Sequence, residues 1–70
     1  QNIMPVIKVI EIMANSPISW EDATKNAIKH AGKSLKGIKS AHVQSQSVVV
    51  DKNNITEFRV NLKISFEVLD

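Results

Sequence analysis

The chain has 70 residues, 43% of them apolar and 23% charged, and its formal net charge is +2. This length admits one domain, and the composition excludes disordered, collagen-like and low-complexity chains. Cysteine is absent, which excludes disulfides, a thiolate nucleophile and zinc sites built on thiolates.

Residues 6–12 predict a first strand, because they are rich in β-branched side chains. Ile10 and Ile12 point to one face of this strand, whereas Ile7 and Val9 point to the other. We therefore expect apolar cover on both faces, with one cover coming from a neighbouring subunit. The residue types at 14–17 are typical of a turn.

A helix is predicted to begin at Trp20, because Ser19 is a good N-cap and Glu21 and Asp22 place carboxylates in the first turn. Gly37 is the expected C-cap. The apolar residues recur at helical spacing and form one stripe: Trp20, Ala23, Ala27, Ile28, Ala31 and Leu35.

Residues 40–50 predict a second, more polar strand, residues 51–54 a turn, and residues 56–68 a third strand. The third strand alternates clearly, with Phe58, Val60, Leu62, Ile64, Phe66 and Val68 on one face. The order βαββ predicts an α+β fold in which a three-stranded antiparallel sheet packs on one helix. We expect a single domain over residues 1–70, with residues 1–4 as an N-terminal extension.

A chain of this size gains only a few kcal/mol from its own core, so a further source of stability is needed. Without disulfides or a visible metal cluster, oligomerisation is the expected source. The sequence contains neither a run of about 18 apolar residues nor a signal-peptide pattern. We therefore expect a cytoplasmic protein that has no membrane partner.

Three segments, residues 6–11, 15–23 and 58–68, make the chain resemble the dodecins over nearly its whole length. The resemblance implies a βαββ subunit whose sheet wraps its helix, and a homododecamer that forms a hollow shell. It also implies a natural start at Met4, no enzymatic activity, and storage of a flavin (riboflavin or flavin mononucleotide) bound in pairs between subunits. In flavin-binding dodecins a tryptophan stacks on the flavin ring and a glutamine bonds its polar edge.

Those two positions correspond to Ser40 and Arg59 in this sequence. Ser40 has no ring to stack on a flavin, which forfeits on the order of 1 kcal/mol or more. Arg59 is always charged and lacks the glutamine's acceptor. We therefore expect no tightly bound cofactor and weak or absent flavin binding. We also expect Arg59 to lie across from about Gln46, roughly 20 Å from Ser40, so that a pocket using both would form between chains.

His42 and Gln44 are expected on the strand face of Ser40, where together with Gln46 they would line a polar cleft for a ligand other than flavin. The interpretation is therefore a shell that binds or buffers a small molecule between subunits. Two alternatives stay open: flavin storage as in typical dodecins, and a structural assembly without a ligand.

The remaining residues that could bind a ligand or a metal, or catalyse a reaction, are interpreted as structural or surface residues. Trp20 is assigned to the core, and His30 and His42 have no partner at metal-site spacing, so we expect surface or interface roles for them. The oxygens at the turn of Asp51, Asn53 and Asn54 do not match an EF-hand, and we predict no metal site. No catalytic constellation is present, which indicates that the chain is not an enzyme. The lysine row, Lys25, Lys29, Lys33 and Lys36, is interpreted as a solvated helix face and not as a nucleic-acid surface.

Overall fold

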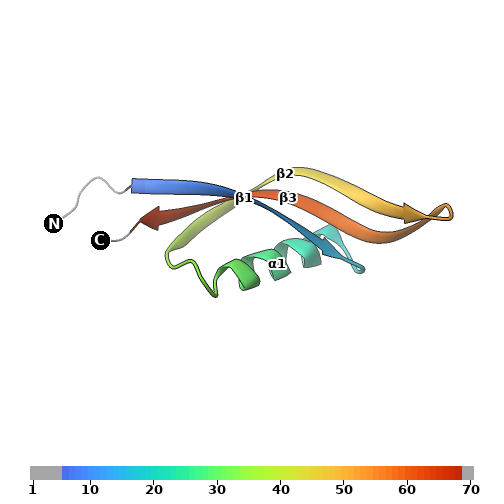
Figure 1. Cartoon of the computed structure of the whole chain (residues 1–70), viewed down its shortest axis with the longest axis horizontal. Coiled ribbons are helices and arrows are strands. Elements are labelled where there is room, and N and C mark those ends of the chain that lie inside the picture. The colour runs from blue at the N-terminus through green and yellow to red at the C-terminus, as the bar shows by residue number, and fades with distance from the viewer. Residues whose placement is uncertain (1–5, 69–70) are drawn as a thin grey trace.

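The computed structural model describes residues 6–68, so the extension expected at residues 1–4 lies outside the described residues. The elements follow the order β1 (Val6–Ser16), α1 (Trp20–Ala31), β2 (Ile38–Asp51) and β3 (Asn54–Val68). The three strands form one antiparallel sheet in the order β1-β3-β2, and α1 lies against one face of it (Figure 1). The α+β fold with βαββ order is thereby confirmed.

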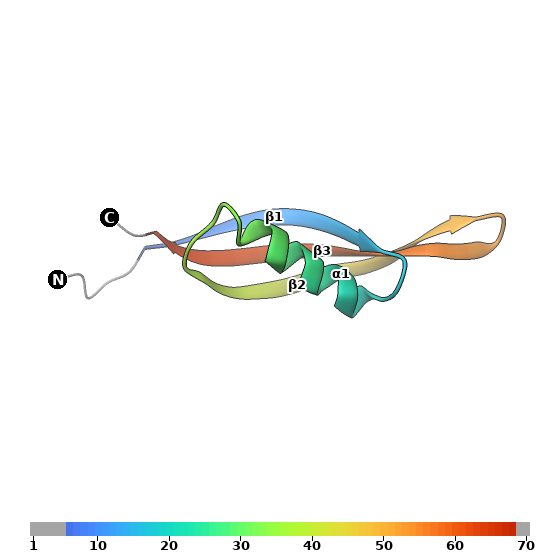
Figure 2. The same cartoon turned by 90° about the horizontal axis from the view of Figure 1, so that it is seen from below.

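The core lies between α1 and the central strand β3. Viewed from the helix side, α1 runs obliquely across the sheet (Figure 2). Alternate residues of β3 point toward the helix, as the sequence alternation predicted. The buried apolar residues of the described chain are Ala23, Ala27, Val60, Leu62 and Ile64.

The predicted helix start is confirmed, and a hydrogen-bonded corner fixes it. The Ser19 hydroxyl accepts the backbone N–H of Asp22 at 2.9 Å, as an N-cap does. Ser16, only 1% exposed, donates its hydroxyl to Asp22 Oδ2 at 2.6 Å and accepts the N–H of Ile18. These bonds connect the end of β1 directly to the first turn of α1.

The first strand is longer than predicted. Ala14 and Asn15 were assigned to a turn, but they continue β1 and pair with Val60 and Arg59 of β3. Their turn propensity is overridden because pairing with the central strand satisfies their backbone groups. The turn is thereby confined to the residues between Ser16 and Trp20.

The predicted helix end is wrong. The helix ends at Ala31 with Gly32 as its C-cap, and Leu35 donates its N–H to the carbonyl of Ala31 from the following turns. Leu35 therefore continues the apolar stripe without being helical, which is why its spacing misled the prediction. Gly37 has φ 76° and accepts the N–H of Glu67 at 3.0 Å, so it adjoins β3 and is not the helix cap.

The turn predicted at residues 51–54 is confirmed as the hairpin turn between β2 and β3. Asp51 and Asn54 are already paired, and only Lys52 and Asn53 lie between them, with φ 52° and 65°. Two consecutive positive φ angles are typical of a type I′ turn, whose twist suits antiparallel strands. The hairpin projects well beyond α1 (Figure 1).

The part of the chain that the structure describes contains no helix long and apolar enough to span a membrane.

Substituting Gly37→Ala is expected to lower the free energy of unfolding by about 1–2 kcal/mol, because a side chain disfavours the left-handed region. Gly32→Ala is the matched control, since Gly32 has an ordinary φ of −63°. An added Cβ would meet a backbone oxygen at 3.3 Å at either position, so the difference between the variants isolates the backbone conformation. Denaturant unfolding at equal protein concentration measures the free energy of unfolding of each variant. Equal decreases in the two variants would contradict this explanation.

Candidate functional site

The candidate site lies on the face of the sheet opposite α1, which we call the outer face. Directly paired residues of antiparallel strands point to the same side, so the register places the side chains in rows. One row contains Ser40 and Ser65, and the next contains His42, Lys63 and Glu11. The polar cleft predicted from the sequence thus acquires partners from β3 and β1.

Ser40 lies on the outer face and is exposed. Its hydroxyl forms a hydrogen bond with the hydroxyl of Ser65 across the β2–β3 pair. Next to it, Lys39 Nζ lies 3.6 Å from Glu67 Oε1. The environment of Ser40 is therefore a small polar surface of hydroxyls and one ion pair, suited to hydrogen bonding and not to stacking on a planar ring.

His42 is exposed on β2 and lies directly opposite Lys63 of β3, which in turn lies opposite Glu11 of β1. An imidazole, an ammonium and a carboxylate therefore share one row across the sheet. Lys63 and Glu67 each lie two positions from Ser65, the partner of Ser40 on β3. This part of the outer face offers hydrogen-bond donors, which favours a ligand with oxygen acceptors.

Gln46 does not continue this face. The register slips between Val43 and Ser45, so Gln44 is the extra residue of a β-bulge. Beyond the bulge Gln46 pairs with Val60, a residue of the α1 side. The expectation that Gln46 shares the face of Ser40 was wrong, because one inserted residue reverses the alternation; Ser45 and Ser47 take the outward positions. The expectation that Gln44 shares this face stays a prediction.

Arg59 also lies on the outer face, but far from Ser40. Its Nε donates to Asn15 Oδ1 at 3.0 Å, and its partner on β2 is Ser47, one residue beyond the predicted Gln46. Six positions of β3 separate Arg59 from Ser65, the partner of Ser40, which corresponds to about 20 Å. One chain therefore does not bring Ser40 and Arg59 into a common pocket, in agreement with the sequence estimate.

All three aromatic residues lie on the helix side of the sheet. Trp20 packs edge-on against Phe58 with ring centroids 5.2 Å apart, and its Nε1 donates to the Ser47 carbonyl at 2.9 Å. Phe66 pairs with Ile38, which packs against the core. The assignment of Trp20 to the core is confirmed, and within residues 6–68 the outer face carries no aromatic ring.

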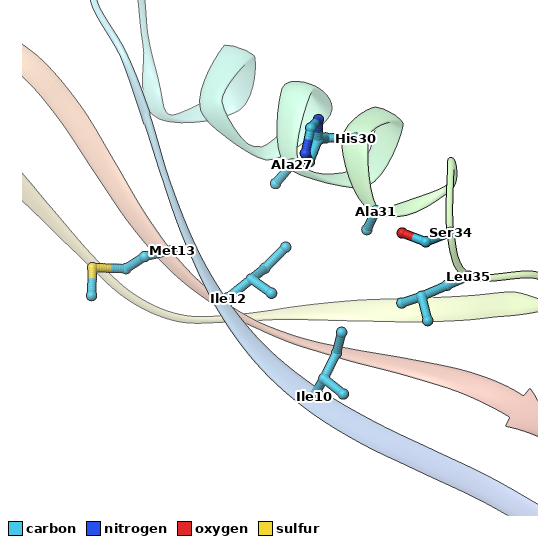
Figure 3. Close-up of a pocket in the computed structure, with 8 residues that line it drawn as sticks. All are labelled: Ile10, Ile12, Met13, Ala27, His30, Ala31, Ser34 and Leu35. Carbon is cyan, nitrogen blue, oxygen red and sulfur yellow. The ribbon is translucent and has the colours of Figure 1, made fainter.

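A second surface feature is a groove of about 410 Å³ between β1 and the C-terminal half of α1 (Figure 3). Ile10, Ile12 and Leu35 give it an apolar floor, and the exposed His30 lies on its helix side. His30 thus occupies a surface position next to an apolar groove. The histidine spacing alone did not predict this groove, because Leu35 reaches it from outside the helix.

Metal-binding residues are not gathered within residues 6–68, where no group of three His, Asp or Glu side chains is placed to hold an ion. At the hairpin turn, the side-chain amide of Asn54 donates to the Lys52 carbonyl. The turn therefore supplies isolated oxygens, whereas calcium requires six to eight.

Sequence reasoning missed Ser65 and Asn15 as partners of the site residues. The alternation of the third strand predicts that Ser65 points outward. Its pairing with Ser40 was not predicted, because it depends on a register shift between Ile38 and Ser40. The contact of Asn15 with Arg59 was not predicted, because the segment of Asn15 has the composition of a turn. Both partners follow from strand register, which local sequence patterns specify weakly when bulges are present.

Comparison with known proteins defines the class of this small, one-helix sheet protein. The dodecin family model matches residues 6–69. Calcium dodecin from Mycobacterium tuberculosis is 38% identical over 65 residues, covering 93% of this chain and 92% of that protein. The chain therefore belongs to the dodecin family.

Solved structures agree with this assignment. Dodecin from Streptomyces coelicolor matches with a TM-score of 0.93, 20% identity and coverage of 99% of each chain, which shows the shared fold. The crystal structure of the Mycobacterium tuberculosis calcium dodecin matches with a TM-score of 0.82, 38% identity and coverage of 91% of each chain. That protein is described as a calcium-chelating antigen with a novel calcium-binding site.

Proposed function

We propose that the chain assembles into a homo-oligomeric shell, twelve copies by analogy with the dodecins, and binds or buffers a small molecule between subunits without acting as an enzyme. The supporting observation is the exposed apolar surface of a single copy. Val6, Ile7, Val9 and Met13 of β1 are each 48–63% exposed, while the described chain buries only five apolar residues. Another copy that covers this surface would supply the missing burial.

Flavin is a poor fit to this site. A flavin ring needs an aromatic platform, but Ser40 is bonded to Ser65 and the aromatic residues lie on the helix side. Every copy in a homo-oligomer has the same sequence, so a second outer face supplies no ring either. Arg59 already donates to Asn15, which uses one of its five donors. A small polar ligand with acceptor oxygens suits the Ser40–His42 region better.

Calcium is a second candidate, because the 38% identical relative is named a calcium dodecin. Beside Ser40, Lys63 repels a cation, and the carboxylate of Glu67 is already paired with Lys39. With no three ligating side chains together in the described chain, a calcium site would combine carboxylates or carbonyls from several copies. Both candidates therefore depend on assembly. The cytoplasmic location and the absence of nucleic-acid binding stay predictions.

Native mass spectrometry of freshly purified protein tests the proposal, because one spectrum reports subunit number and retained ligands. We expect a twelve-chain species, either bare or carrying a repeated small increment. An increment equal to a flavin would contradict the weak-flavin prediction. A monomer at micromolar concentration would contradict the assembly itself.

The double substitution Ser40→Trp with Arg59→Gln is expected to raise riboflavin affinity at least tenfold, because it supplies the stacking ring and the amide that this chain lacks. Quenching of riboflavin fluorescence measures the affinity. Ser45→Trp with Arg59→Gln is the control, since Ser45 is exposed on the same face of β2. If the first variant binds no better than the parent, the correspondence of Ser40 to the stacking position is wrong.

Calcium binding predicts a rise in unfolding temperature when calcium is added to chelator-treated protein. At a hundredfold excess over Kd the stabilisation would be about 2.7 kcal/mol. Magnesium at the same concentration is the control, because it prefers a tighter octahedral site. Equal unfolding temperatures with calcium and with chelator would exclude calcium as a ligand.

A further inference from the structure

Two exposed apolar features lie far apart on the molecule. One is the groove between β1 and α1, with Ile10, Ile12 and Leu35 on its floor (Figure 3). The other is the cross-strand pair Val50 and Ile55 beside the hairpin turn, each 57% exposed. We call this pair with residues 51–54 the hairpin tip.

The groove and the hairpin tip of one copy do not meet. Ile55 and Ile64 are nine positions apart on β3, which corresponds to about 30 Å, and Ile64 pairs with Ile10 of the groove. The tip points away from α1 (Figures 1 and 2), whereas the groove is lined by the C-terminal half of α1 and the residues that follow it. Any contact between them joins one copy to another.

We propose that the hairpin tip of one copy inserts Val50 and Ile55 into the β1–α1 groove of a neighbouring copy. This inference rests on the proposed assembly and specifies one of its contacts. The groove volume of about 410 Å³ accommodates two branched aliphatic side chains. The tip is the part of the sheet that projects beyond the rest of the molecule, so it reaches a neighbour without backbone rearrangement.

The residues beside the two surfaces carry opposite charges. The sequence has no carboxylate between Asp22 and Asp51, and within that span Lys29 and Lys33 flank His30 of the groove. The hairpin tip itself is electrically neutral, with Asp51 and Lys52, and Glu57 beside it adds a carboxylate. Glu57 beside the tip and the lysines beside the groove attract one another in this orientation.

The contact is head-to-tail, because it joins two different surfaces of identical chains. Such a contact repeats from copy to copy until the rotation closes a ring. A closed ring leaves no groove or tip unpaired. The groove is therefore occupied in the assembled protein and is not a ligand pocket.

Cross-linking tests the contact cleanly because the parent chain has no cysteine. In the double variant Ser34→Cys with Ile55→Cys, one cysteine lines the groove and the other is on the tip. A short bismaleimide is expected to give covalent dimers and larger species on a denaturing gel. The two single variants control for random reaction, and Ser34→Cys with Ser45→Cys controls for a cysteine on the exposed outer face.

Ile55→Asp provides a second test, with Asn53→Asp as a control that adds the same charge to the tip and keeps the apolar pair. Ile55→Asp is expected to weaken the assembly at least tenfold in dissociation constant by native mass spectrometry, whereas Asn53→Asp is not. Circular dichroism confirms that each variant is folded.

The outcomes separate this inference from the proposed function. If the parent is oligomeric but the double-cysteine variant gives no more cross-links than its controls, the proposed contact is wrong and the assembly is unaffected. The same conclusion follows if the Ile55→Asp variant assembles normally. A monomeric parent overturns both. Binding of anilinonaphthalene sulfonate to the assembled parent, lost when Ala31→Glu fills the groove, would show an open groove and also overturn the contact.

Discussion

The close packing of two alanines on the central strand is the contact on which the rest of this structure depends. Ala23 and Ala27 of α1 are buried against Val60, Leu62 and Ile64 of β3. Small side chains on the helix let it approach the branched residues of the sheet closely, which excludes water from the narrow contact. Ser16, Asp22 and Ser19 fix where the helix begins, so the position of α1 on the sheet is set at one end by hydrogen bonds.

The helix α1 is much shorter than the strand β3 on which it packs. A helix of 12 residues spans about 18 Å, whereas the 15 residues of β3 span about 50 Å. The helix therefore covers only the middle of the sheet, and the projecting hairpin has no cover from its own chain. The exposed apolar residues of β1 and of the hairpin tip are consequences of this mismatch, and they are the surfaces that the proposed assembly would cover.

The sequence predicted the parts that local chemistry determines. The alternation in β3 identified its buried face, and Ser19 marked the helix start, because both signals arise from neighbouring residues. The errors occurred where distant pairing decides the structure. Gln46 turned to the helix side because of a bulge at Gln44, and Asn15 left its expected turn because β3 offered it a strand partner. Ser40 and Arg59 were placed correctly far apart, since their separation depends mainly on strand length.

The proposed ligand binding and the proposed assembly would be thermodynamically linked. The described part of a single copy holds Ser40 and Arg59 about 20 Å apart and gathers no three metal-ligating side chains. A ligand that contacts two copies binds the assembled state and not the isolated chain, so it stabilises the assembly by mass action. The reverse also holds, because a change that strengthens the contact between copies raises ligand affinity by the same coupling free energy. In the proposed assembly, residues remote from the ligand would therefore control its affinity through the assembly equilibrium. Loss of ligand binding in a variant would identify a ligand contact only when the number of subunits is unchanged.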